Sequence, residues 1–392
     1  MQDNDLGRKI ALMLVASLTV MSSATIAASL PRMADVFRDT PDAEFLTKLV
    51  LTTPNLVIVA FGPIAGAIID RFGRVRFLYA NLVLYGFAGA SGYVLDDLYQ
   101  ILVARALLGV AIAGTMTTVN TLAGDYWTGE ERARYAGIQS VAMSLGGVVF
   151  IGVGGLLADW SWRLPFLVYL AAWPILIPAM KYLGEPGRHA QEPGQGAAPQ
   201  PRRFGTIAAV CAITFAAMVM FYLMPTQLPF LVRDIGIGSS ALAALAIVVA
   251  SLTLGLGSAV FPAVKRHAGF VMVYMVSMLL IALGYGVTAY ASSYALLLLG
   301  AAIAGFGVGL IFPNAQLWVL MLAPQRLRGR FTGILSASTN LGQFSSPVLV
   351  QPAVLALGLA GAFGVVAGFA ALVALALILA GRRLEKAPPR PA

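Results

Sequence analysis

The most constraining feature of this sequence is a succession of apolar runs, each about 20 residues long and nearly free of charge. A helix needs about 20 such residues to cross the hydrocarbon core of a bilayer. Water-soluble domains carry about 25% charged residues, whereas Asp, Glu, Lys and Arg make up only 11% of these 392 residues. The pattern therefore predicts an all-α membrane protein, because lipid tolerates apolar side chains on the outside of a fold.

Twelve of these runs are long enough to span a membrane. The first could imitate a signal peptide, but it is long enough to span and many further runs follow it. We therefore predict a multi-pass protein of twelve transmembrane helices. Their approximate bounds are 10–30, 48–69, 75–95, 98–122, 135–157, 164–183, 204–231, 241–264, 270–291, 294–322, 331–355 and 359–379.

The basic residues predict the orientation, because cytoplasmic loops carry an excess of Lys and Arg. With the N-terminus inside, 20 of the 26 basic residues fall on the inner side and Arg105 lies within a span. We therefore predict that both termini are cytoplasmic, in a bacterial inner membrane. The net charge of +9 then reports orientation, and no nucleic-acid partner is expected. The predicted outer segments hold only Arg32, Arg38, Lys48, Arg163 and Arg233.

The chain is predicted to consist of two homologous six-helix bundles, residues 1–183 and 204–392. Residues 184–203 are rich in proline and glycine and have the composition of a flexible cytoplasmic linker. Repeated halves with a substrate site between them, near the bilayer midplane, are a known transporter design. A shift of 196 residues aligns the halves without a gap, placing Gly73 on Gly269, Gly109 on Gly305, Arg132 on Arg328, Gly137 on Gly333 and Ser140 on Ser336.

The loop between the second and third spans carries Gly66, Asp70, Arg71, Gly73 and Arg74. We expect Gly66 to let a neighbouring helix pack closely and Gly73 to permit a tight turn. Asp70 ends a helix where it can meet a cation or a helix N-terminus. The spacing resembles the signature loop of the major facilitator superfamily. The resemblance implies a cytoplasmic latch whose charge pairs favour the outward-facing state.

Asp125, at the cytoplasmic end of the fourth span, is the predicted sixth member of this latch. It is placed to pair with Arg71 or Arg74. The fourth span also carries Arg105, followed by Gly109, which resembles a second motif of the family.

An arginine inside a span is costly and normally faces the bundle interior. Two interpretations of Arg105 stay open: a charge that binds substrate or tunes a protonatable group, and a structural hydrogen-bond hub or snorkelling side chain.

The end of the fifth span resembles the drug:proton antiporter branch of the family. The resemblance lies in Gly154-Gly155 with Ala158 and in Trp162-Arg163 with Phe166. The antiporter signature has a Gly-Pro pair where this chain has Phe150 and Ile151, so this part does not imply antiport. The set as a whole is most similar to bacterial drug- and sugar-efflux permeases.

The resemblance implies a small-molecule substrate and protons as the coupling ion, although no acid lies at the centre of a span. Asp35 and Asp125 are the remaining acids considered for coupling, besides Asp70. In the family, helices 1, 4, 7 and 10 line the cavity, with 2, 5, 8 and 11 beside them. The polar residues on these helices include no acid within a span, so the predicted cavity is polar but uncharged, which suits neutral or weakly polar substrates better than strong cations. The substrate-binding candidates on these helices are Thr25, Asn120, Gln139, Tyr222, Asn314 and Asn340.

The leading interpretation is therefore a monomeric, lipid-embedded secondary transporter that exports small organic compounds. Import of a nutrient or metal by the same fold is the second interpretation; the methionines Met218, Met220 and Met224 resemble part of a copper importer's pattern. A membrane sensor is the third. No cofactor, metal site or enzymatic motif is expected, and the single Cys211 excludes an intrachain disulfide.

Overall fold

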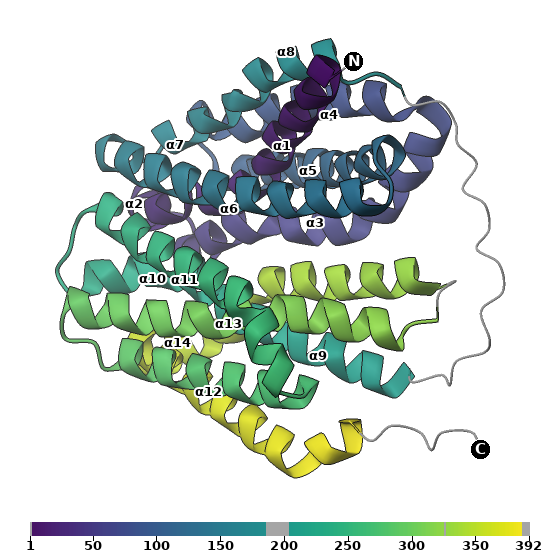
Figure 1. Cartoon of the computed structure of the whole chain (residues 1–392). Coiled ribbons are helices and arrows are strands. Elements are labelled where there is room, and N and C mark those ends of the chain that lie inside the picture. Colours follow the sequence, from purple (N-terminus) through teal and green to yellow (C-terminus); the bar gives the residue numbers. More distant parts are fainter. Residues whose placement is uncertain (1, 186–203, 325–326, 386–392) are drawn as a thin grey trace, which may run out of the picture. The chain divides into compact units, whose positions relative to one another are not determined.

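The computed structural model describes residues 2–185, 204–324 and 327–385, and every regular element in these ranges is a helix (Figure 1). The chain forms two compact units. The first consists of Met1–Gln191 with Gly236–Val248, and the second of Glu192–Ile235 with Val249–Ala392. The predicted linker lies outside the described residues from residue 186 onward, so the division at 184–203 stays a prediction.

The first half of the sequence folds into helices that correspond to the first six predicted spans. In chain order they are α1 (Gln2–Ala24), η1 (Ala27–Ser29), α2 (Leu30–Val36), α3 (Ala43–Phe72), α4 (Arg74–Ala90), η2 (Ser91–Tyr93), α5 (Leu98–Tyr126), α6 (Gly129–Trp160), α7 (Leu164–Leu167), η3 (Val168–Ala171) and α8 (Ala172–Tyr182).

The second half folds into fewer but longer helices. They are α9 (Phe204–Phe221), α10 (Leu223–Asp234), α11 (Ser240–His267), α12 (Phe270–Ala289), α13 (Tyr294–Leu322) and α14 (Arg328–Glu385).

Nine stretches of the described residues are helical, long enough and apolar enough to cross a membrane. One of them, in α14, contains two spans, because Gly358 has the non-helical angles φ 73° and ψ 178° and interrupts the helix. The remaining two predicted spans are α4, which has only 17 residues, and α1, whose first turns carry charges. The prediction of an all-α membrane protein of twelve spans is therefore confirmed.

Three spans that the sequence predicts as continuous helices are interrupted, and a proline accounts for the break between α9 and α10. Proline lacks an N–H and its ring clashes with the carbonyl four residues earlier. Pro31 lies at the start of α2, after α1 has ended at Ala24, and Pro165 lies at the start of α7. Pro225 lies four residues after Phe221, the last residue of α9. The span predicted over 10–30 consists of most of α1, then η1 and the first residue of α2.

The predicted shift of 196 residues reappears in the helix boundaries. Leu98 and Tyr126 bound α5, and Tyr294 and Leu322, each 196 positions later, bound α13. The residue before each helix caps it: the Asp97 carboxylate accepts from two amides of α5, and the Ser293 hydroxyl accepts from one of α13.

A second repeated feature joins α4 to α1 in the first half and α12 to α9 in the second half. The Tyr85 hydroxyl donates to the Leu18 carbonyl and the Tyr285 hydroxyl to the Met220 carbonyl, each at 2.6 Å. All four residues are buried. Each half therefore holds its first helix through the same kind of contact.

Candidate functional site

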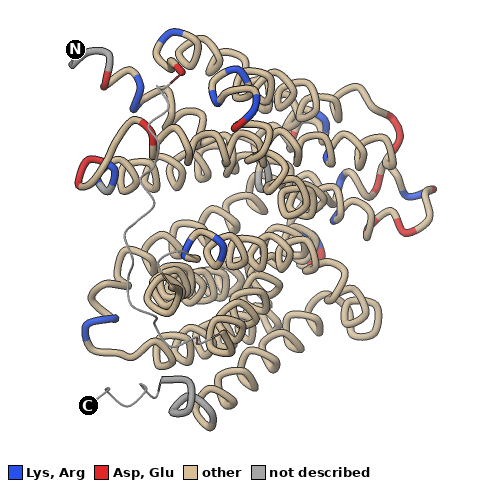
Figure 2. The backbone as a smooth tube through the Cα atoms, turned by 90° about the vertical axis from the view of Figure 1, so that its right-hand side faces the viewer, with Lys and Arg blue, Asp and Glu red and all other residues tan. Residues whose placement is uncertain are grey.

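Charged residues lie mostly at the helix ends and connections (Figure 2). Within the described ranges, only two charged residues are buried, Lys48 and Arg105, and no Asp or Glu is. The Lys48 ammonium pairs with the Glu44 carboxylate at 2.6 Å, one turn earlier in α3, and Glu44 is 46% exposed. The buried charge of the described chain is therefore cationic.

The predicted latch loop joins α3 to α4. Gly73 separates the two helices with φ 93°, a conformation that favours glycine because a side chain there would be strained. Asp70 and Arg71 are exposed near the end of α3. These residues and Glu185 line a surface hollow of about 470 Å³.

An ion pair joins two residues of the latch. Nε of Arg74 lies 3.1 Å from Oδ2 of Asp125, and the two side chains are 19% and 20% exposed. Of the two partners that the sequence offers for Asp125, the structure places Arg74 in contact with it. The pair joins the start of α4 to the end of α5.

Glu185, which was not among the residues predicted from the sequence, also binds the start of α4. Its carboxylate accepts hydrogen bonds from the amides of Arg74, at 2.7 Å, and Val75, at 3.0 Å. The first amides of a helix have no partner inside the helix, so a carboxylate there satisfies them and opposes the helix dipole. The signal in the sequence was an acid directly after the sixth span, on a side rich in bases.

Gly66 is the first glycine of the predicted latch. Among the described residues, no heavy atom lies within 4 Å of a Cβ at Gly66, so the close helix contact expected there stays a prediction. A close approach involving α3 occurs at Gly109 of α5, where a Cβ would lie 2.8 Å from the Pro54 carbonyl oxygen.

Arg105 is 1% exposed and lies among residues of the first unit. Its Nη2 donates to the Gly89 carbonyl at 2.9 Å. The guanidinium lies 4.9 Å from the ring centre of Phe166 and 4.7 Å from that of Tyr169. Its hydrogen bond joins α5 to α4, and the two rings belong to α7 and η3. This environment favours the structural interpretation, in which Arg105 holds three spans together.

The predicted substrate residues differ widely in exposure. Asn120 is exposed, Gln139 is half-buried, and Tyr222 is buried at the interruption between α9 and α10. Asp35, one of the candidates for coupling, is exposed near the end of α2. Asn120 and Asp35 are therefore accessible in this structure.

Three other candidates donate to backbone carbonyls. The Thr25 hydroxyl donates to Met21 at 2.7 Å, and the Asn340 amide to Ser336 at 2.9 Å. The Asn314 amide reaches Phe270 at 3.1 Å and links α13 to α12. These bonds engage the donors of all three side chains.

Several buried side chains beyond these candidates have polar atoms without a hydrogen-bond partner among the described residues, and two of them, Gln227 and Thr115, lie on helices expected to line the cavity. Gln227 of α10 is 1% exposed, and neither its amide oxygen nor its amide nitrogen has such a partner. Thr115 of α5 is fully buried, and its hydroxyl also has none. Buried polar groups normally have partners, so these two groups are available for hydrogen bonds with a bound molecule.

Comparison with curated proteins finds relatives at modest identity. The chain is 34% identical to the bacillibactin exporter of Bacillus subtilis over 31% of this chain and 32% of that protein. The match thus spans about a third of that relative. The chain is 27% identical to the 3-(3-hydroxy-phenyl)propionate transporter of Escherichia coli over 83% of this chain and 82% of that one.

Among solved structures, a D-xylose-proton symporter matches with a TM-score of 0.77 at 16% identity. The match covers 95% of this chain and 97% of that one, and it shows a shared fold. The model of the Major Facilitator Superfamily matches residues 12–264 and 209–392, which together cover nearly the whole sequence. This multi-pass, non-enzymatic chain therefore belongs to the Major Facilitator Superfamily of secondary transporters.

Proposed function

We propose that this transporter exports small organic compounds in exchange for protons, by alternating access. The main support for this class of substrates is the sign of the buried charge. The buried charges of the described chain are Lys48 and Arg105, and its other buried polar residues are neutral. A cationic substrate needs a buried acid to offset the loss of its hydration, so neutral and anionic compounds fit better.

The export direction rests on two similarities. One relative that matches about a third of this chain is named as an exporter. The glycines and the Trp162-Arg163 pair at the end of α6 and the start of α7 resemble the drug:proton antiporter branch. Both similarities support a direction of transport rather than a particular compound.

Import of an aromatic acid is the second candidate. It is favoured by the relative that matches most of both chains, whose name gives 3-(3-hydroxy-phenyl)propionate as its substrate. Two buried cations and the absence of a buried acid from the described ranges also suit a carboxylate substrate.

For substrate recognition we propose Gln227 and Thr115, because their buried polar atoms have no partner in the part of the chain that the structure describes. The sequence-derived candidates Asn120, Gln139 and Tyr222 stay part of this proposal. An amide supplies both a donor and an acceptor, so Gln227 suits a hydroxyl, amide or carboxyl group on the substrate.

We also retain the latch, consisting of Gly66, Asp70, Arg71, Gly73, Arg74 and Asp125, as a conformational element. Asp125 and Asp35 stay the candidates for proton coupling. Both termini are proposed to face the cytoplasm, which periplasm-active reporter fusions at either end would contradict.

The test is transport in proteoliposomes with an imposed pH gradient, with matched neutral, anionic and cationic aromatic compounds. We expect a gradient to drive neutral or anionic compounds out of the proton-poor compartment and to leave cations unmoved. Accumulation in the opposite direction would favour the importer. Cation transport would show that the charge argument is wrong. Protein-free liposomes and a gradient collapsed by an uncoupler are the controls.

A further inference from the structure

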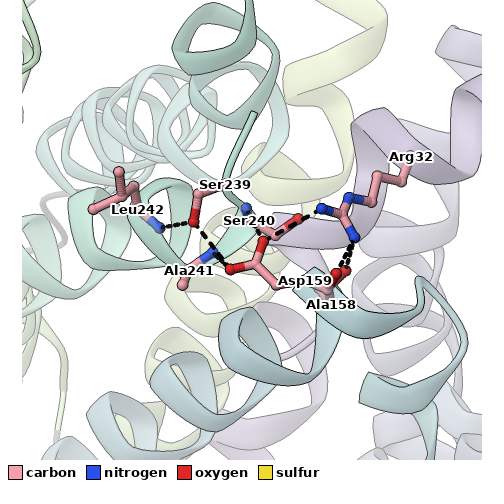
Figure 3. A network of polar contacts seen from close by, with 7 residues as sticks. All are labelled: Arg32, Ala158, Asp159, Ser239, Ser240, Ala241 and Leu242. Carbon is pink, nitrogen blue, oxygen red and sulfur yellow. Dashed lines mark hydrogen bonds and ion pairs between the residues drawn. The ribbon is translucent and has the colours of Figure 1, made fainter. Parts of the chain in front are cut away.

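The carboxylate of Asp159, the next-to-last residue of α6, binds the start of α11 (Figure 3). It accepts hydrogen bonds from the amide of Ser240 at 2.5 Å and the amide of Ala241 at 3.3 Å. The Ser239 hydroxyl donates to it at 3.0 Å. Asp159 therefore satisfies amides that have no acceptor inside α11.

Ser239 also acts within its own helix. Its hydroxyl oxygen accepts from the Leu242 amide at 3.3 Å while its proton is donated to Asp159. The hydroxyl thus links the local cap of α11 to the distant carboxylate. A negative charge at this position also opposes the positive end of the helix dipole.

Arg32 of α2 holds Asp159 from the other side. Its Nη1 donates to the carbonyls of Ala158, at 2.7 Å, and Asp159, at 2.6 Å, and its Nη2 lies 3.5 Å from Oδ1 of Asp159. The two carbonyls lie in the last turn of α6, where a cation is favoured. Figure 3 shows the guanidinium on one side of the carboxylate and the start of α11 on the other.

Small residues in α6 allow this approach. A Cβ at Gly155, one turn before Asp159, would lie 2.2 Å from the Ala244 Cβ of α11. A Cβ at Gly154 would lie 2.1 Å from the Thr25 carbonyl oxygen. The glycines that resemble an antiporter motif therefore place Asp159 within reach of α11.

The contact involves parts of both sequence halves. Residues Gly236–Val248, which include the first turns of α11, group with the first unit, while the helix from Val249 onward groups with the second. The shift of 196 residues places Leu355, not an acid, at the position equivalent to Asp159. The duplicated fold therefore does not itself require a carboxylate here.

Transporters built from two repeated halves work by moving one half against the other around a fixed site. We propose that Arg32, Asp159, Ser239, Ser240 and Ala241 form a releasable cap, the Asp159 cap, which stabilises the conformation seen here and opens once in each transport cycle. The proposal rests on the alternating access that the proposed function assumes. It does not depend on the substrate or on the coupling ion.

The test measures the distance between α6 and α11 without substrate. Spin labels are attached at Leu156→Cys and Leu245→Cys, both exposed positions, in a Cys211→Ser background. We expect Asp159→Asn, which removes the charge and keeps the shape, to shift the equilibrium toward the longer distance about tenfold, because a charge-assisted cap is lost. Asp159→Glu should restore part of the shorter population.

Asp97→Asn is the matched control, because Asp97 is also a carboxylate cap but serves its own helix, α5. It should leave the distances unchanged. If Asp159→Asn fails to fold, the same distance is measured in Arg32→Gln and Ser239→Ala, since each removes bonds of the cap and leaves the carboxylate. Unchanged distances in the folded variants, or equal shifts in Asp97→Asn, would overturn the proposal. Shifted distances in a protein that shows no proton-driven transport would count against the proposed function and not against the Asp159 cap.

Discussion

Nε of Arg74, the first residue of α4, lies 3.1 Å from Oδ2 of Asp125, the next-to-last residue of α5. The pair is about four-fifths buried, which limits its screening by solvent. It joins the loop that resembles the family signature to the end of the helix that carries Arg105. The two residues can therefore be tested together, by single and double substitutions.

Asp125→Asn and Arg74→Gln should each lower the transport rate, because each leaves its partner unpaired. The double variant should be no slower than the slower single variant, since both changes remove the same interaction. Initial rates in proteoliposomes measure this. Asp96→Asn, in the exposed pair with Arg163, is the control and should transport normally. Independent, multiplying effects of the two latch changes would contradict the coupling.

Glu185→Gln should loosen the start of α4, because it removes the charge that caps the amides of Arg74 and Val75. Loss of a cap costs about 1 kcal/mol, which corresponds to about fivefold faster hydrogen exchange of these amides. Exchange followed by mass spectrometry checks this. Glu131→Gln, an exposed acid in the first turn of α6, is the control. Equal exchange in wild type and Glu185→Gln would exclude a capping role.

Arg105→Ala should lower the stability of the first half by roughly 3 kcal/mol, since it removes a charged hydrogen bond and two cation–π contacts. Arg105→Lys should restore little, because an ammonium does not reproduce a planar guanidinium between two rings. Thermal unfolding in detergent measures the loss. A variant with unchanged melting temperature and abolished transport would instead support a direct role in substrate handling.

Gly92→Ala should destabilise the protein, because its Cβ would lie 2.1 Å from Cε1 of the buried Phe166 ring. Overpacking of this kind costs about 1–3 kcal/mol. Gly286→Ala in α12 is the matched control, since nothing lies within 4 Å of that Cβ position. It should leave the melting temperature unchanged or raise it, because alanine favours a helix. Equal melting temperatures for the two variants would show that the ring moves aside.

Gln227→Met should weaken substrate binding about tenfold without loss of stability. A buried amide without partners contributes no hydrogen bond to the fold, whereas its bonds to a substrate would be lost. Substrate titration of transport, together with thermal unfolding, separates the two effects. Thr226→Val is the control, because that hydroxyl is already bonded to the Tyr222 carbonyl. A destabilised Gln227→Met variant with normal substrate affinity would show that this amide stabilises the fold and does not bind substrate.

Hydropathy and the repeat predicted most of the fold, because both depend on local sequence. The length of an apolar run limits where a helix crosses the bilayer, and the shift of 196 residues related both ends of α5 and α13 correctly. The interruption at Ala24 was missed because apolar residues continue on both sides of it. Pro31 does not explain this interruption, since its ring meets the carbonyl of residue 27, three residues after α1 has ended.

The polar contacts were harder to predict, because their partners lie far apart in the sequence. Glu185 binds an amide 110 positions away and Asp159 one 81 positions away. In the sequence both look like ordinary acids in connecting segments. The partner of Asp125 was predicted only as one of two arginines, because hydropathy does not determine how α4 and α5 rotate about their axes.

The burial of Arg105 also limits the order in which the chain is inserted during its synthesis. An unpaired arginine raises the cost of moving its helix into lipid, by up to about 2.5–3.5 kcal/mol at the helix centre, and Arg105 lies two turns inside α5. The Gly89 carbonyl is made before Arg105, but the rings of Phe166 and Tyr169 are made only after the whole of α6. We therefore expect α5 to wait beside the insertion machinery until α7 and η3 emerge, so that these spans leave it as an assembled group.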